Sequence, residues 1–267
     1  MDGYKTLTVE AAGTKFKVFV FYPHNCSNTD ILVLFHGLNR KAKSLRNKAV
    51  RIAQQECLII FSPLFDKKRF PNWRYHRAGV FHAGQPQPRD QWTGPILQAL
   101  LNQFRKLSCI RNCKTYLFGH SAGGQFLSRI SAYSPPISVT SIVIANPSMY
   151  VLPKLQINVP DGFAGLFSDL EARRMLKEYL AMPISIYLGQ ADTGNKYLVK
   201  SHEAMRQGRT RLDRGRHVFQ LARQISKDNG WRFNWKLIEV ANVGHSSKGM
   251  LNAPELRSAL RIYNDQI

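Results

Sequence analysis

The motif G-H-S-A-G-G at residues 119–124 constrains the fold more than any other stretch of the chain. It follows an apolar run at residues 115–118 and precedes a segment, 126–133, whose apolar residues have helical spacing. A G-x-S-x-G motif between a strand and a helix is typical of a nucleophile elbow, a tight turn that exposes a serine hydroxyl at the edge of a sheet. Glycines on both sides of the serine allow the strand and the helix to approach closely. The pattern predicts that Ser121 is a nucleophile.

Two backbone amides are candidate donors to the oxyanion that forms when a serine attacks a carbonyl group. The N–H of Ala122 begins the predicted helix, where unpaired donors and the positive end of the helix dipole lie. A second donor is expected in the loop after the apolar run at residues 31–35, which reads H-G-L-N. The N–H of Leu38 is the best candidate there, and that of Asn39 is the alternative.

A serine nucleophile also needs a histidine base and an acid that orients this base. In chains with this elbow the acid and then the histidine follow the serine. His245 comes after the last predicted strand, 236–240, and Asp192 comes after the preceding strand, 184–188. We therefore expect a triad of Ser121, His245 and Asp192. The alternative for Asp192 is an aspartate that only caps its loop.

The remaining histidines near these elements are interpreted as structural. His36 and His120 flank the predicted site and are expected to pack or orient rather than to act as bases. His202 and His217 lie in helical patterns after the serine, and we expect them at the surface.

Hydrophobic patterning predicts one α/β domain over residues 1–267. Continuous apolar runs are typical of strands that are buried on both faces of a parallel sheet. The predicted elements are a hairpin at 6–11 and 15–22, strands at 31–35, 58–61, 115–118, 142–145, 184–188 and 236–240, and helices at 41–55, 89–107, 211–228 and 254–263. This alternation predicts a mostly parallel sheet flanked by helices.

Two segments interrupt the alternation of strands and helices. Residues 62–88 are rich in proline, glycine and aromatic side chains, and a connection of this length is typical of a functional loop. Residues 147–182 leave the carboxyl end of a strand, the edge at which α/β proteins form their sites. We expect this second segment to be a partial lid, and a plain surface insertion is the alternative.

Positive charge is the unusual feature of the composition. The chain has 38 Lys and Arg against 17 Asp and Glu, a net charge of +21. Residues 40–51 carry six basic side chains and no acidic one. Such a field attracts anionic polymers, anionic substrates or membrane surfaces. Without a helix-turn-helix, zinc-finger or aromatic RNA-binding motif, the sequence predicts no specific binding of nucleic acid.

The four cysteines and the first residues bear on the compartment. Cys26, Cys57, Cys109 and Cys113 have no metal-binding spacing and are interpreted as ordinary thiols, with a Cys109–Cys113 pair left open for an oxidising compartment. Residues 1–5 lead directly into a predicted strand without an apolar signal core. We therefore expect a cytoplasmic protein, and a trimmed secreted form stays open.

These features resemble the α/β-hydrolase family of esterases, lipases and polyhydroxybutyrate depolymerases. The resemblance covers nearly the whole chain and rests on the elbow, the His36-Gly37 loop, Asp192 and His245. The second half is similar to a group of bacterial hydrolases without an assigned substrate, through residues 192–193, 204–208, 214–216, 235 and 243–245.

The resemblance implies an α/β-hydrolase fold and hydrolysis of a small or polymeric carboxylic ester through an acyl-enzyme, with no metal or organic cofactor. The depolymerases have an aromatic substrate cleft, for which Trp73, Trp92 and Tyr150 are the candidates. Amide or thioester hydrolysis uses the same triad and stays open. A hydrolase scaffold that only binds an anionic partner is the alternative from a different class. The oligomeric state is not predicted.

Overall fold

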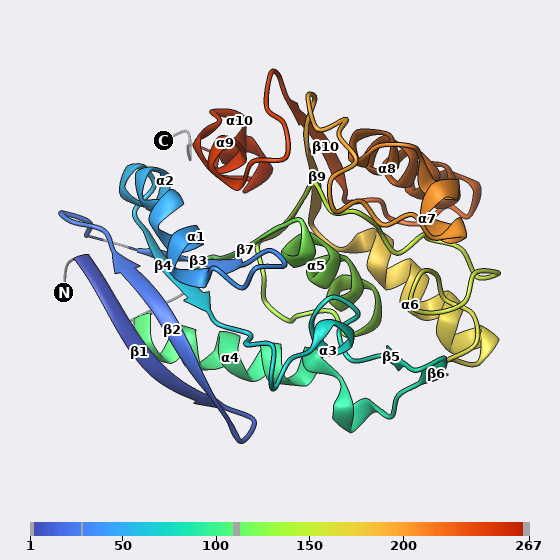
Figure 1. Ribbon diagram of the computed structural model, residues 1–267, viewed down its shortest axis with the longest axis horizontal. Coiled ribbons are helices and arrows are strands. Elements are labelled where there is room, and N and C mark those ends of the chain that lie inside the picture. Colours follow the sequence, from blue (N-terminus) through green and yellow to red (C-terminus); the bar gives the residue numbers. More distant parts are fainter. Residues whose placement is uncertain (1–2, 28, 109–112, 264–267) are drawn as a thin grey trace.

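A sheet of eight strands forms the centre of the computed structural model, which describes residues 3–27, 29–108 and 113–263 (Figure 1). The strand order is β1-β2-β4-β3-β7-β8-β9-β10, and every neighbouring pair from β4 to β10 is parallel. The strands are β1 (Gly3–Ala11), β2 (Thr14–Tyr22), β3 (Asp30–Phe35), β4 (Leu58–Pro63), β7 (Thr115–His120), β8 (Ser141–Ala145), β9 (Ile184–Gly189) and β10 (Lys236–Val240). A separate short ribbon pairs β5 (Phe81–His82) with β6 (Gln85–Pro86).

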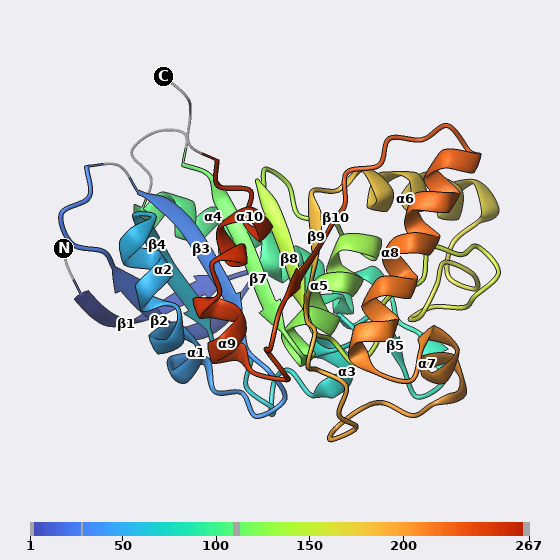
Figure 2. The same ribbon diagram turned by 90° about the horizontal axis from the view of Figure 1, so that it is seen from above.

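Helices cover both faces of the sheet because its central strands carry buried apolar side chains on both sides. In β3, Ile31 and Val33 face one core while Leu32 and Leu34 face the other. The first core is closed by α4 (Thr93–Ser108), α5 (Ala122–Tyr133), α6 (Asp169–Ala181) and α8 (Arg211–Asp228), and the second by α1 (Ala42–Lys48), α2 (Val50–Gln55), α9 (Ser247–Asn252) and α10 (Glu255–Ala259) (Figures 1 and 2). This arrangement confirms the predicted fold class, the α/β-hydrolase fold.

Some boundaries differ from the predicted ones. The helix expected at 41–55 is two helices, because the chain tightens at Ala49, whose N–H bonds to the carbonyl three residues earlier. The helix expected at 89–107 begins with a single turn at Arg89–Gln91 before α4. Two further short helices, α3 (Asn72–Tyr75) and α7 (His202–Gln207), lie in loops at the carboxyl edge of the sheet. No helix in the described part of the chain is both long and apolar enough to cross a membrane.

The segment predicted as a lid is anchored to the body of the molecule. Residues 146–168 are mostly irregular before α6, yet Val151 and Phe163 are fully buried. Asp161 in this segment forms an ion pair of 2.8 Å with Arg129 of α5. Its role as a lid stays a prediction.

A disulfide joins Cys26 to Cys57, so the expectation of ordinary thiols is wrong for these two residues. Each cysteine lies just before a strand, and the two strands, β3 and β4, are parallel neighbours in the sheet. The cysteines therefore meet at the amino end of the sheet, with their Cα atoms 5.7 Å apart, although 31 residues separate them in sequence. The Cys109–Cys113 pair that the sequence left open includes Cys109, which lies outside the described part of the chain.

Replacing both Cys26 and Cys57 by serine is expected to lower the free energy of unfolding by about 3–4 kcal/mol, because the bond closes a loop of this length in the unfolded chain. The denaturant midpoint should fall and the slope should rise, because the unfolded chain without the bond exposes more surface, and urea titration of wild type and double variant measures both. The bond lies at the amino ends of the strands, whereas Ser121 follows the carboxyl end of β7. We therefore expect kcat, measured at a temperature well below the melting temperature, to stay at the wild-type value. Equal midpoints would show that the bond does not contribute to stability.

Candidate active site

Ser121 lies on a strained turn between β7 and α5. Its φ of 58° and ψ of −114° fall outside the regions that L-residues favour, at a cost of about 1–3 kcal/mol. The turn leaves no room for side chains: a Cβ added to Gly119 would lie 2.3 Å from the carbonyl oxygen of Gly123, and one added to Gly123 would lie 2.1 Å from that of Phe35. The Ser121 N–H donates to the Ala145 carbonyl at the end of β8 (2.9 Å), which fixes the turn to the sheet.

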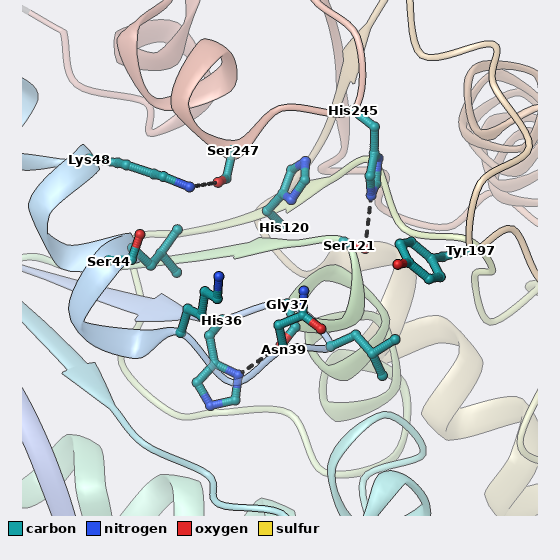
Figure 3. A pocket seen from close by; sticks show the side chains of 13 residues that line it. His36, Gly37, Asn39, Ser44, Lys48, His120, Ser121, Tyr197, His245 and Ser247 are labelled. Carbon is teal, nitrogen blue, oxygen red and sulfur yellow. Dashed lines mark hydrogen bonds between the residues drawn. The ribbon is translucent and has the colours of Figure 1, made fainter.

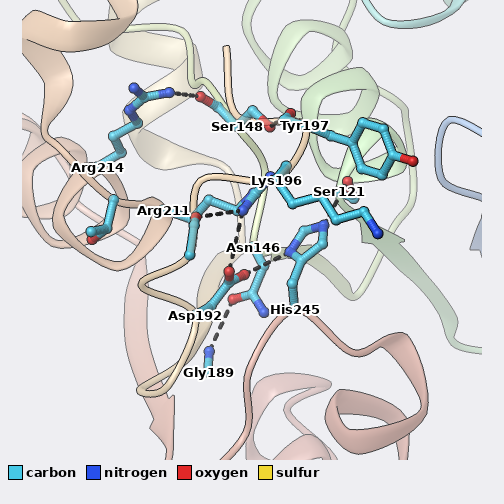
Figure 4. A network of polar contacts seen from close by, with 12 residues as sticks. Ser121, Asn146, Ser148, Gly189, Asp192, Lys196, Tyr197, Arg211, Arg214 and His245 are labelled. Atoms are coloured by element: carbon cyan, nitrogen blue, oxygen red, sulfur yellow. Dashed lines mark hydrogen bonds and ion pairs between the residues drawn. The ribbon is translucent and has the colours of Figure 1, made fainter. Parts of the chain in front are cut away.

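The three residues predicted as a triad form a continuous hydrogen-bonded series. The Nε2 atom of His245 is 3.0 Å from the Ser121 hydroxyl, and its Nδ1 atom is 2.6 Å from Oδ2 of Asp192 (Figures 3 and 4). The Asp192 side chain is 1% exposed, whereas that of His245 is 28% exposed. Because the carboxylate accepts the Nδ1 proton, Nε2 is left free to accept a proton from the serine.

Backbone contacts hold the two loops that carry Asp192 and His245 against each other. The Ala191 N–H donates to the Val243 carbonyl (3.0 Å). Gly189 ends β9 so close to the second loop that an added Cβ would lie 2.2 Å from the same Val243 oxygen. Because β9 and β10 are parallel neighbours, Asp192 and His245 lie at the same level beyond the carboxyl ends of the two strands.

Two further polar side chains support this arrangement, and sequence reasoning missed both. Arg211, at the start of α8, places Nη1 3.3 Å from Oδ1 of Asp192, and both side chains are 1% exposed. Asn146 follows β8 and accepts the Gly189 N–H on its side-chain oxygen (2.9 Å), which ties the ends of two strands together (Figure 4). The only sequence signal for Arg211 is its place in the run of basic residues at 206–216.

The structure brings the candidate oxyanion donors to Ser121. Ala122 is the first residue of α5 and is buried. Gly37 lies next to Ser121: an added Cβ would make an ordinary van der Waals contact, 3.9 Å, with the Ser121 Cβ. Leu38 and Asn39 both line the cavity that contains Ser121, so the loop stays the source of the second donor and Leu38 its predicted residue.

His36 and His120 are placed as structural residues. The His36 Nε2 atom accepts the Phe65 N–H (3.1 Å), and burial, with Arg40 nearby, lowers its pKa to about 3. Burial also lowers the pKa of His120, whose ring centre is 4.7 Å from that of His245. Both imidazoles are therefore neutral at ordinary pH, and His120 packs against His245 without adding a charge.

Ser121 and His245 open onto a cavity of about 230 Å³ with cationic walls (Figure 3). Lys41 and Lys48 line it, and none of its described lining residues is acidic. The Lys48 ammonium donates to the Ser247 hydroxyl (2.9 Å). The opposite wall is Tyr197, whose side chain lies beside the nucleophile although the residue is 69% exposed. Among the described residues, no three His, Cys, Asp or Glu side chains are grouped to hold a metal ion.

The three aromatic residues predicted to bind substrate do not line this cavity. Trp73 stacks on His82 at 4.5 Å between ring centres and lines a second cavity of about 530 Å³. Trp92 is 4% exposed and Tyr150 is fully buried. Their contribution to substrate binding stays a prediction.

An eight-stranded, mostly parallel sheet with a serine on such a turn defines an α/β serine hydrolase. The solved structure of poly(aspartic acid) hydrolase-1 from Sphingomonas sp. KT-1 is similar to this chain with a TM-score of 0.86 and 30% sequence identity, over 98% of both chains. The chain therefore belongs to the α/β serine hydrolases, in the same family as that enzyme.

Two further solved structures are similar to this chain. LpqC, a poly(3-hydroxybutyrate) depolymerase from Bordetella parapertussis, is similar with a TM-score of 0.84 and 26% identity, over 98% of this chain and 96% of that one. XC6422 from Xanthomonas campestris, an α/β serine hydrolase without a lid, shares the fold with a TM-score of 0.50 and 14% identity, over 97% and 92% of the two chains. No family model and no curated protein matches the sequence.

Proposed function

We propose that the protein hydrolyses carboxylic esters of an anionic, polymeric substrate through an acyl-enzyme on Ser121. The observation that carries this proposal is the hydrogen-bonded series of Ser121, His245 and Asp192, which opens onto a cavity lined by lysines. Geometry of this kind is what a serine nucleophile needs for acyl transfer.

The reaction follows from these contacts in two steps. His245 Nε2 takes the Ser121 proton as the serine oxygen attacks the ester carbonyl, and the Asp192 carboxylate stabilises the imidazolium. The amides of Ala122 and Leu38 stabilise the negative oxygen of the tetrahedral intermediate. The alcohol leaves with the proton from His245. Water then gives a proton to His245, attacks the acyl-enzyme and releases the acid, and Ser121 regains its proton.

Positive charge at the mouth of the site favours an anionic substrate. Lys41 and Lys48 can pair with carboxylates on substrate units next to the reacting bond, and no described acidic side chain in the cavity opposes them. The net charge of +21 attracts a polyanion from a distance, an effect that salt screens. An anionic membrane surface would experience the same long-range attraction, although the lysines of the cavity favour a chain that enters it.

Amide hydrolysis is the second candidate activity. It is favoured by the 30% identity to poly(aspartic acid) hydrolase-1, a name that indicates a polymer joined by amide bonds. The same series of residues serves both reactions, because His245 can protonate a leaving amine as well as an alcohol.

Matched substrates separate these possibilities. We expect an ester with a carboxylate next to the scissile bond to have a kcat/KM about 10-fold above its neutral analogue at low salt, and to lose most of this advantage at 0.5 M NaCl. Lys48→Gln should lower kcat/KM about fivefold for the anionic ester and leave the neutral ester unchanged. The amide with the same acyl group, assayed in parallel, decides between the two bond types.

Lys177→Gln, at an exposed position of α6, is the control substitution outside the cavity. Equal dependence of the anionic and neutral esters on ionic strength would contradict charge selection. Turnover of the amide alone would replace the ester proposal with the amide one.

A further inference from the structure

Arg211 is a fully buried cation that holds the acid of the triad and a neighbouring loop at once (Figure 4). Its Nη1 atom donates to Oδ1 of Asp192 (3.3 Å) and to the Gly194 carbonyl (3.2 Å). Its Nη2 atom donates to the Lys196 carbonyl (2.6 Å). A planar guanidinium can make these bonds together, whereas an ammonium group cannot span them.

The loop held by Arg211 carries a wall of the catalytic cavity. Tyr197 directly follows Lys196 and lies beside Ser121 (Figure 4). Its φ of 56° is a left-handed conformation that a tyrosine adopts only when its surroundings impose it. The carbonyls of both residues are fixed: that of Lys196 by Arg211, and that of Tyr197 by the Ser148 hydroxyl (3.2 Å).

We propose that Arg211 is a positioning residue that couples Asp192 to the Tyr197 wall of the cavity. The inference rests on the proposed function, in which His245 is the base. It assigns two roles to one side chain: the guanidinium orients the Asp192 carboxylate, and its bonds to the Gly194 and Lys196 carbonyls shape the cavity.

Two variants test these roles. Arg211→Gln removes the guanidinium from all of its partners, and we expect kcat to fall about 10-fold and KM to rise about 10-fold. Arg211→Lys keeps a cation that can reach one partner but cannot span all of them, and we expect KM to rise about 10-fold as the Tyr197 wall loosens, with kcat nearly unchanged. Both are compared at equal concentrations of active sites, counted with a fluorophosphonate that labels the serine.

Arg214→Gln is the matched control. Arg214 lies one turn along α8, is equally buried and donates to the carbonyls of Ser148 and Gly208, but it contacts no triad residue. It should lower stability without lowering kcat. An equal fall of kcat in Arg214→Gln and Arg211→Gln, or an unchanged kcat in Arg211→Gln, overturns the role of Arg211 in orienting Asp192.

If Arg211→Gln does not fold, Arg211→Lys still decides the positioning role: an unchanged KM overturns the coupling. Ser121→Ala separates this inference from the proposed function. If Ser121→Ala stays active, the proposed function fails. If it is inactive while both Arg211 variants keep the wild-type kcat and KM, only the role of Arg211 fails.

Discussion

Ser121→Ala is expected to lower kcat for ester hydrolysis about a millionfold, because without the hydroxyl no acyl-enzyme can form and His245 has no proton to accept. Initial rates on a series of p-nitrophenyl esters of increasing acyl length measure this loss in the variant and the preferred acyl length in the wild type. KM for substrate binding should change little, since the cavity walls stay in place. Labelling by a fluorophosphonate should disappear together with the activity.

Ser131→Ala is the matched control for this experiment. Ser131 is buried on the same helix, α5, and its hydroxyl has no described partner. Its replacement should leave both activity and labelling at the wild-type level. Labelling of a residue other than Ser121, or activity that survives in Ser121→Ala, would contradict the assignment of the nucleophile.

Asp192→Asn is expected to lower kcat about 10⁴-fold through the tautomer of His245. Arg211 donates to Oδ1, so the new side chain should turn its carbonyl oxygen toward the guanidinium and its NH₂ group toward His245. Nδ1 must then accept, the ring proton moves to Nε2, and the base can no longer take the proton of Ser121. Single-turnover kinetics with an activated ester should show slow acylation with little change in binding.

Asp228→Asn, an exposed residue at the far end of α8, should behave as wild type. A melting temperature measured for both variants separates loss of fold from loss of chemistry, because Asp192→Asn also leaves Arg211 without its carboxylate. A folded Asp192→Asn enzyme with nearly full activity would show that another group orients His245.

The strands and the elbow could be predicted because their signals are local. Ser121 is marked by two glycines within two residues of it, and the contacts of Gly119 and Gly123 show why no larger side chain fits. Asp192 and His245 could be placed because each follows a strand of a parallel sheet, whose carboxyl ends meet at one edge. Chain order and sheet direction therefore predict that these three residues lie at the same end of the sheet.

What could not be predicted depends on contacts between distant segments. Arg211 lies in a basic helix, and nothing in its neighbours shows that it is buried against an aspartate. Aromatic residues such as Trp92 and Tyr150 occur both in substrate clefts and in hydrophobic cores, and the sequence does not distinguish these cases. In this fold both are buried in the core. The polar wall of the cavity comes instead from α1 and the loop before α7, which sequence patterns do not bring together.

The Cys26–Cys57 disulfide indicates the redox state of the compartment in which the protein folds. Glutathione and thioredoxin keep such thiols reduced in most cytosols, whereas the bacterial periplasm and the extracellular space oxidise them. We therefore propose that the protein acts in an oxidising compartment, in place of the cytoplasmic location expected from its first residues. A polymer too large to cross a membrane would be accessible to an enzyme there.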